Sequence, residues 1–262
     1  MKTRLKVVSP AAPEREKILE IQRLRKVFRS AGGYLAALEQ IDFSVKKGEL
    51  ICILGRSGCG KSTLLKILAG FLAPTAGRVL LGGTPVRRPG PDRGVVFQED
   101  ALFPWLTVEE NIAFGMRQHR WPKKSVKEEV DRYLALVGLS EFRHYLPREI
   151  SGGMKQRVAL ARVLILQPRV LLMDEPFAAL DAQTRDEMQQ LMLSLWKTFS
   201  HTILFVTHDV TEAVLLADRI LLMGKDPGRI REDIAVDLFR PRDAQTESFV
   251  FFCRRLFEGL RQ

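Results

Sequence analysis

A glycine-rich run between an apolar segment and a helical segment constrains this chain more than any other feature of its sequence. The run reads GRSGCGKST over residues 55–63, and it follows the apolar residues Leu50–Leu54. It matches the pattern G-x-x-x-x-G-K-[ST], and KSTLLKILAG continues from it as a predicted helix that ends at Gly70. Glycines let a backbone wrap around phosphates, and the helix N-terminus balances their negative charge. The sequence therefore predicts a nucleotide phosphate site on a strand–loop–helix unit.

The residues of this loop have separate predicted tasks. Lys61 brings a full positive charge to the β- and γ-phosphates, and the Ser62 hydroxyl is a ligand for Mg²⁺. The predicted ATP-binding set of the loop is Gly55, Arg56, Ser57, Gly58, Cys59, Gly60, Lys61, Ser62 and Thr63.

A second motif, VLLMDEP at residues 170–176, is an apolar strand that ends in two carboxylates. Asp174 at the end of the strand can reach Mg²⁺ or its water shell. Glu175 then faces the γ-phosphate, where it can polarise a water. Two carboxylates at a strand end can also be there only because that end is exposed to solvent. The phosphate loop upstream favours the catalytic interpretation.

A third segment, ISGGMKQRVALARVL at residues 150–164, resembles another anion site. One serine and two glycines precede a long helical run, so free amide groups are predicted at a helix N-terminus. This segment lies about ninety residues after the phosphate loop, and one nucleotide does not need two such sites in one chain.

Short apolar strands alternate with helices over most of the chain, which predicts an α/β fold with a mostly parallel sheet covered on both faces. Strand patterns fill residues 17–54 and return at 78–82 and 94–97, followed by RVLLMD, TILFVT and RILLM. Helices are predicted at 153–167, 182–199 and DVTEAVLLAD, with a final amphipathic helix at 243–262. Residues 99–150 carry helical periods separated by Pro and Gly, which indicates an inserted helical subdomain.

Composition limits the cell compartments and the kinds of partner that we expect for this protein. No apolar stretch is long enough to span a membrane, and the N-terminus lacks the apolar core of a secretory signal. Three scattered cysteines fit neither a disulfide framework nor a zinc site, so a reducing cytoplasm is predicted. The net charge of +10 is not interleaved with a ladder of aromatic residues, which disfavours a single-strand nucleic-acid platform.

The ordered motifs GRSGCGKST, VVFQED, ISGGMKQRVALARVL, VLLMDEP, AALD and FVTHD together resemble the ATP-binding subunit of an ABC transporter over about residues 18–225. The resemblance implies a P-loop NTPase (RecA-like) core with an antiparallel β-subdomain and an inserted α-helical subdomain. It implies a flexible tail at 1–16, an ATPase domain at 17–242 with its helical subdomain at about 99–154, and a short helical extension at 243–262. The cofactors implied are ATP and Mg²⁺.

The resemblance also assigns roles to residues outside the first two motifs. Gln98 is similar to the Q-loop glutamine, which contacts Mg²⁺ or the attacking water and senses the membrane subunit, so the implied metal ligands are Ser62, Gln98 and Asp174. Asp181 is similar to the D-loop aspartate at the dimer interface, and His208 to the switch histidine at the γ-phosphate. A lone histidine at a strand end otherwise packs or caps, but His208 lies just before a predicted helix start. Glu175 is the implied general base.

The resemblance assigns the third segment as the family's signature sequence, formed by Ser151, Gly152, Gly153 and Met154. It is implied to close on ATP held by a second copy of the chain, so the apparent redundancy predicts ATP-dependent dimerisation. Two positions depart from the family's pattern, since Ile150 replaces the usual leucine and Met154 the usual glutamine. The serine and the backbone amides remain, and we expect phosphate binding to survive both changes.

The adenine-stacking residue is left open between two aromatic residues. Phe28 in RKVF fits best and Tyr34 is the rival, and either can instead be a core residue. A phenylalanine offers a stacking face without a hydrogen bond, so modest base selectivity is expected.

The motifs around Gln98, Asp174 and His208 resemble the nitrate/sulfonate/taurine importer group most closely. This implies an ATPase dimer at the cytoplasmic face of the inner membrane, two membrane permease subunits, an extracytoplasmic solute-binding protein and no nucleic-acid partner. Residues 99–116 are the candidate docking surface, although Phe103, Pro104 and Trp105 can equally belong to the core. The alternatives are another ABC importer, a two-part exporter, or a soluble ABC ATPase acting on nucleic acid, and neither the solute nor the transport direction follows from this chain.

Overall fold

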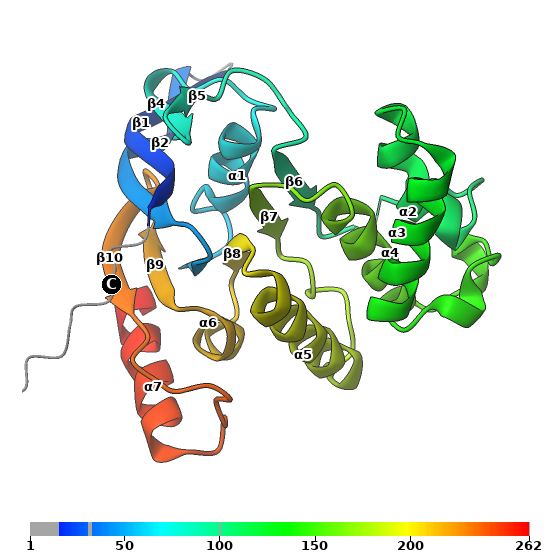
Figure 1. The fold of residues 1–262 in the computed structure, drawn as a ribbon. Helices are drawn as coiled ribbons and strands as arrows, with labels where there is room; N and C mark the ends of the chain where they lie inside the picture. Colours follow the sequence, from blue (N-terminus) through cyan, green and yellow to red (C-terminus); the bar gives the residue numbers. More distant parts are fainter. Residues whose placement is uncertain (1–15, 31–32, 100, 262) are drawn as a thin grey trace, which may run out of the picture.

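The computed structural model describes residues 16–30, 33–99 and 101–261, so most of the predicted tail at 1–16 lies outside the described residues. Its centre is a six-stranded sheet in the order β10-β9-β3-β8-β7-β6 (Figure 1). Its strands are β3 (Leu50–Gly55), β6 (Arg93–Val96), β7 (Val170–Asp174), β8 (Thr202–Thr207), β9 (Arg219–Gly224) and β10 (Arg229–Ala235). All neighbours run parallel except β10, which is antiparallel to β9. The predicted mostly parallel sheet is confirmed.

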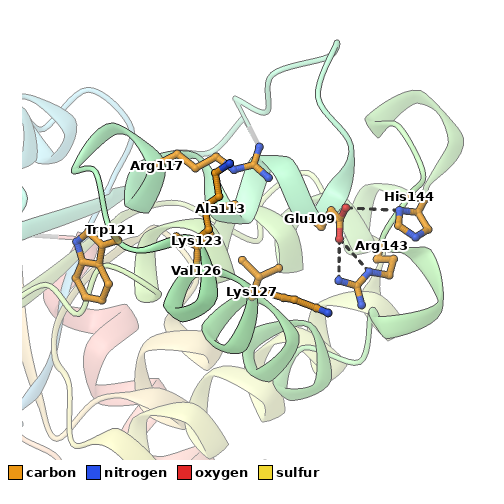
Figure 2. Close-up of a pocket in the computed structure, with 10 residues that line it drawn as sticks. Glu109, Ala113, Arg117, Trp121, Lys123, Val126, Lys127, Arg143 and His144 are labelled. Atoms are coloured by element: carbon orange, nitrogen blue, oxygen red, sulfur yellow. Dashed lines mark hydrogen bonds and ion pairs between the residues drawn. The ribbon is translucent and has the colours of Figure 1, made fainter.

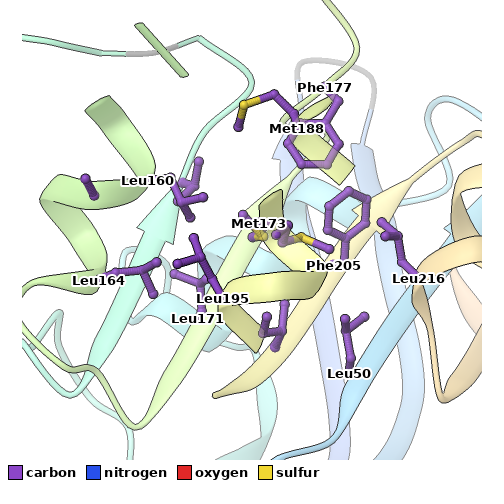
Figure 3. Close-up of a cluster of buried hydrophobic side chains, with 14 of the residues drawn as sticks. Leu50, Leu160, Leu164, Leu171, Met173, Phe177, Met188, Leu195, Phe205 and Leu216 are labelled. Carbon is purple, nitrogen blue, oxygen red and sulfur yellow. The ribbon is translucent and has the colours of Figure 1, made fainter. Parts of the chain in front are cut away.

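Helices cover this sheet because its central strands are apolar on both faces. Every residue of β3 and of β8 is buried. Ile51 and Ile53 face a core shared with α1 (Lys61–Ala69), whereas Leu50 and Phe205 face a second core. The second core is closed by α4 (Gly152–Leu164), α5 (Ala182–Phe199), α6 (Val210–Leu216) and α7 (Glu247–Arg261). Figure 3 shows the part of this core to which α4, α5 and α6 contribute.

A smaller sheet lies beside α1 and completes the first core. Its order is β2-β1-β4-β5, and all of its pairs are antiparallel. The strands are β1 (Lys17–Ser30), β2 (Gly33–Lys46), β4 (Ala76–Leu81) and β5 (Thr84–Pro85). The implied α/β fold class with an antiparallel subdomain is therefore confirmed.

The segment between β6 and β7 is helical, as predicted. It contains α2 (Val108–Gln118), α3 (Lys123–Leu136) and the short 3-10 turns η1 (Ser140–Phe142) and η2 (Pro147–Glu149) before α4. Thr107 starts α2 with a capping box, because its side chain accepts from the Glu110 amide while Glu110 accepts from the Thr107 amide. In Figure 1, α2, α3 and α4 form a group on the side of the molecule opposite α7.

The sequence did not predict two of the strands. The sequence patterns gave no signal for β5, which has two residues, or for β10, whose residues RIREDIA are mostly exposed. The final helix was predicted over 243–262, and α7 begins at Glu247 after a turn in which the Thr246 hydroxyl donates to the Asp243 carbonyl. Within the described residues, every helix is too short or too polar to cross a bilayer.

Candidate nucleotide site

The phosphate loop joins the end of β3 to the start of α1, as the motif predicts. Gly58 and Gly60 both have positive φ, at 81° and 99°, and Gly60 is the N-cap of α1. A Cβ atom on Gly60 would lie 2.8 Å from Leu38 Cδ2 and 2.9 Å from the Ala37 carbonyl oxygen, so only glycine fits there. The first turn of α1 contains no acidic residue. Its amide groups and helix dipole therefore remain available to a bound anion.

Lys61 is folded back over this loop. Its side chain is only 4 % exposed, and its Nζ donates to the Gly55 carbonyl oxygen over 2.8 Å. The same Nζ lies 3.5 Å from Oε1 of Glu175. The ammonium is thus held at the mouth of the loop by the backbone on one side and by a carboxylate on the other.

Asp174 is the last residue of β7 and Glu175 follows it, and β7 is the neighbour of β8 in the sheet. The Ser62 hydroxyl donates to Oδ1 of Asp174 over 3.1 Å. Burial is the main cause of a raised pKa at Asp174, and the hydrogen bond from Ser62 opposes it. A desolvated carboxylate beside a hydroxyl fits Mg²⁺, which commonly takes one or two protein oxygens and completes its shell with water and substrate phosphates. The described residues contain no cluster of three or more His, Cys, Asp or Glu side chains that could hold a metal ion.

His208 completes a short row of polar side chains with Glu175 and Lys61. Its Nδ1 atom lies 2.7 Å from Oε2 of Glu175. The amide of Glu175 donates to the Val206 carbonyl oxygen over 3.0 Å, and the φ of Glu175 is 46°. A left-handed conformation is unusual for glutamate, and it turns the chain sharply just after the strand. The carboxylate consequently lies between an ammonium and an imidazole.

The other predicted residues lie on the phosphate loop and on separate strands or the segment after β6. Gln98 is exposed two residues after β6, at the edge of the sheet next to β7. Cys59 is buried in the loop, and this burial raises the pKa of its thiol. Phe28 is 37 % exposed beneath the Lys26 ammonium, and Tyr34 is 81 % exposed on the paired strand. Neither ring is a core residue, and the choice between them for adenine stacking stays a prediction.

The signature segment, defined as Ser151–Met154, forms the start of α4. Ser151 is the N-cap, and its Oγ accepts from the Met154 amide over 3.3 Å. A Cβ atom on Gly152 would have nothing within 4 Å, whereas one on Gly153 would lie 2.3 Å from Cγ2 of Thr184. Met154 packs its side chain against the second core. Ser151 and Gly152 are exposed, whereas Gly153 is buried against Thr184.

Asp181 is linked to this segment by Thr184, which binds Asp181 and lies against Gly153. Its two carboxylate oxygens accept from the Thr184 amide over 3.0 Å and from the Thr184 hydroxyl over 2.7 Å, which makes it the N-cap of α5. These hydrogen bonds, the backbone one first, lower the pKa of Asp181. The structure thus brings together two motifs that the sequence placed thirty residues apart.

Comparison with known proteins decides the family. The family model described as ABC transporter matches residues 38–178. The chain belongs to the ABC transporter family. An uncharacterised ABC transporter ATP-binding protein of Methanocaldococcus jannaschii is 45% identical over 93% of this chain and 91% of its own length. The predicted resemblance and the ATPase class are confirmed.

Relatives with more specific names also cover most of this ABC protein. The nitrate import ATP-binding protein NrtD of Synechococcus elongatus is 45% identical over 90% of this chain and 88% of its own length. The taurine import ATP-binding protein TauB of Burkholderia pseudomallei is 50% identical over 84% of each chain. Among solved structures, the ATP-binding cassette MJ0796, a dimer in a post-hydrolysis state bound to ADP and Pi, superposes with a TM-score of 0.74. It is 28% identical and covers 85% of this chain and 100% of its own.

Two positioning residues of this ABC cassette were missed by the sequence analysis. Gln156 is 4 % exposed on α4, and its Nε2 donates to the Pro176 carbonyl oxygen over 2.7 Å, just after Glu175. Arg185 on α5 donates to the carbonyl oxygens of Phe177 and Leu180. The signal for Gln156 was present, since an amide on the apolar face of a predicted helix must find a buried partner.

Proposed function

We propose that this chain is the ATP-hydrolysing subunit of a bacterial ABC importer that powers uptake of a small anionic solute, of the nitrate, sulfonate or taurine type, through separate membrane subunits. The names of NrtD and TauB, at 45% and 50% identity over most of the chain, support the direction and the solute class. The protein acts at the cytoplasmic face of the inner membrane as a peripheral subunit. An extracytoplasmic solute-binding protein selects the cargo.

The observation that carries the hydrolytic role is the position of Glu175 between Lys61 and His208, at 3.5 Å and 2.7 Å. A bound γ-phosphate competes with Glu175 for the Lys61 ammonium, because phosphate carries more negative charge. Glu175, freed from that ion pair, accepts the proton of the attacking water as general base. His208 then lies at the γ-phosphate and stabilises the charge that develops there.

Ser62, Asp174 and Gln98 are the residues that would hold Mg²⁺. When bound, the ion neutralises charge on the β- and γ-phosphate oxygens. Ser62 and Asp174 already point at one another over 3.1 Å, so little side-chain movement is needed to place both oxygens on one ion. The loop amides and Lys61 orient the triphosphate, and Phe28 or Tyr34 stacks on the adenine.

We propose that the signature segment acts on the nucleotide of a second copy of this chain. Ser151, Gly152 and Gly153 present a helix N-terminus without an acidic first turn, which suits an anion. Asp181 lies against the same segment and forms part of the dimer contact. Twofold symmetry then gives two equivalent composite sites.

The experiment is Ser151→Arg, with Ser140→Arg as the matched control on another exposed serine. Ser151→Arg is expected to bind ATP at near wild-type affinity as a monomer, since Lys61 and the loop are untouched. It is expected to lose the ATP-dependent dimer in size-exclusion chromatography and to lose hydrolysis. Normal hydrolysis by this variant, with the control also normal, would refute action in trans.

The permease subunits are proposed to dock on residues 99–116. Phe103, Pro104 and Trp105 differ in exposure. Phe103 is half-buried, with its ring centroid 4.4 Å from that of Phe114. Pro104 is exposed and Trp105 is 72 % exposed, so these two residues belong to the surface. A cavity of about 420 Å³ beside them is lined by Ala101, Phe103, Phe114 and Arg162. An exposed tryptophan next to a partly apolar cavity is typical of a protein contact.

The test of the transport role uses the complex rather than the isolated chain. Trp105→Ala is expected to keep basal ATPase activity and to reduce recovery of the permease subunits from detergent-solubilised membranes. The reconstituted complex is expected to respond to binding protein loaded with nitrate, taurine or an alkylsulfonate with raised ATPase activity. Stimulation by none of these anions would contradict the solute class and leave the hydrolytic role standing.

A further inference from the structure

A cavity away from the phosphate loop lies in the groove between α2 and α3 (Figure 2). Its volume is about 790 Å³, which is in the range of small-molecule sites. The side chains of Ala113, Val126 and Val130 line it and are buried. The groove therefore offers apolar surface to a ligand at its base.

Cations surround this apolar base. Arg117 lies on α2, and Lys123 and Lys127 lie one turn apart on α3; all three line the cavity and are exposed. Among the described residues, the ion pairs of this region join Arg143 and His144 to Glu109, Arg143 to Asp131, Lys124 to Glu128, and Arg132 to Glu129. None of them involves Arg117, Lys123 or Lys127, so within the described residues none of the three forms an ion pair. The carboxylate on which the charge of Arg117 acts, Glu110, does not line the cavity.

The one carboxylate that lines the cavity is already neutralised. Glu109 accepts from Arg143, whose Nε lies 2.9 Å from Oε2, and the His144 Nδ1 lies 3.6 Å from Oε1. Hydrogen bonds to Glu109 and Asp131 raise the pKa of Arg143. Figure 2 shows this cluster at one end of the groove and Trp121 at the other. A compact ligand fits between two such ends better than an extended chain does.

We infer that the α2–α3 groove binds a small organic anion with an apolar body. The buried side chains contact the body, Trp121 stacks against it, and Arg117, Lys123 and Lys127 bind its carboxylate, sulfonate or phosphate group. The site is separate from the ATP phosphate loop and does not depend on the proposed solute or on dimerisation.

The probe is 8-anilinonaphthalene-1-sulfonate, an aromatic sulfonate whose fluorescence reports binding, titrated into the full chain with ADP present to fill the nucleotide site. Because Trp105 and Trp196 also transfer energy to bound dye, the groove-bound fraction is taken from the part of the energy-transfer signal that Trp121→Phe removes. Arg117→Glu and Lys127→Glu are each expected to weaken the groove-bound fraction by at least about 10-fold, the scale for loss of a charged hydrogen-bond partner.

The matched control is Lys124→Glu, on the same helix but outside the groove, with a side chain 89% exposed. It makes the same change in net charge and is expected to alter affinity by less than about 2-fold, because the ligand does not contact this position and exposed charges are screened. Basal ATPase activity reports that each variant is folded. Neutral N-phenyl-1-naphthylamine has the same aromatic body without the sulfonate and is expected to bind at least about 10-fold more weakly to the wild-type chain. Equal affinity for the two probes, or an equal effect of Lys124→Glu and Lys127→Glu, would overturn the inference.

Discussion

The Nδ1 atom of His208 lies 2.7 Å from Oε2 of Glu175, although 33 residues separate them in the sequence. The two residues meet because β7 and β8 are parallel neighbours, with Asp174 paired to Val206 at their carboxyl ends. Ligand sites in open parallel sheets form at that edge. The other oxygen of Glu175 lies 3.5 Å from Lys61, so one carboxylate joins three motifs of the sequence.

The first prediction concerns the carboxylate itself. Glu175→Gln is expected to retain ATP binding, because the amide keeps the shape of the side chain and the phosphate loop is unchanged. Turnover is expected to fall by roughly 10²–10⁴-fold, the usual scale for loss of a general base. Single-turnover hydrolysis and nucleotide titration measure the two effects separately. Wild-type hydrolysis by this variant would remove Glu175 from the mechanism.

The second prediction separates binding from chemistry at Lys61. Lys61→Ala removes the ammonium that lies between Gly55 and Glu175, so ATP affinity itself is expected to drop by roughly 10–100-fold. Nucleotide titration measures this loss, with the exposed Lys124→Ala as control. Unchanged ATP affinity in Lys61→Ala would show that the loop amides suffice to hold the phosphates.

Much of this site follows from the sequence alone because each motif carries its own local geometry. The phosphate loop needs glycine at Gly60, and the pattern G-x-x-x-x-G-K-S states that requirement directly. Asp174 and His208 fall at strand ends that apolar runs reveal. Periodicity therefore predicts both the strands and the edge at which they converge.

The features that the sequence did not predict depend on contacts between elements that are distant in the sequence. The fit of Thr184 against Gly153 requires the relative position of α4 and α5, which no local pattern encodes. The edge strand β10 is mostly exposed, so it lacks the apolar signal of its neighbours and is defined by pairing with β9. The α2–α3 groove likewise exists only once the two helices pack together.

The third prediction uses that helix contact. Gly153→Ala places a Cβ atom 2.3 Å from Cγ2 of Thr184, so either Thr184 rotates away from its hydrogen bonds to Asp181 or α4 shifts away from α5. Overpacking of this kind costs about 1–3 kcal/mol of folding free energy, and it moves the signature segment relative to Asp181. A lower Tm and reduced hydrolysis are expected.

The second-site variant Thr184→Ser makes this a test of mechanism. Serine lacks the clashing methyl group but keeps the hydroxyl that donates to Asp181. The double variant Gly153→Ala with Thr184→Ser is therefore expected to recover stability and hydrolysis towards the wild-type level, with a coupling measurable in a double-mutant cycle. Additive losses would show that the contact does not position the signature segment.

The last prediction concerns a buried carboxylate on α6, the helix that follows His208. Glu212 on α6 is 5 % exposed, and its Oε1 accepts from Gln189 over 3.3 Å. Burial is the main cause of a raised pKa at Glu212, and hydrogen bonds from Thr207 and Gln189 oppose it. The folded chain consequently retains this proton at pH values where the unfolded chain, with a pKa near 4.5, has released it.

The sign of the pH dependence follows from that difference in bound protons. Where the folded state binds more protons than the unfolded state, the free energy of unfolding falls as pH rises. Glu212→Gln removes this contribution, so the variant is expected to gain stability relative to the wild type as pH rises above 4.5 towards the raised pKa. Denaturant unfolding of both proteins between pH 5 and pH 8 measures the difference, with the exposed Glu141→Gln as control. A wild-type protein that gains stability over the variant as pH rises would contradict the assignment, because it would require an ionised Glu212 stabilised by its partners.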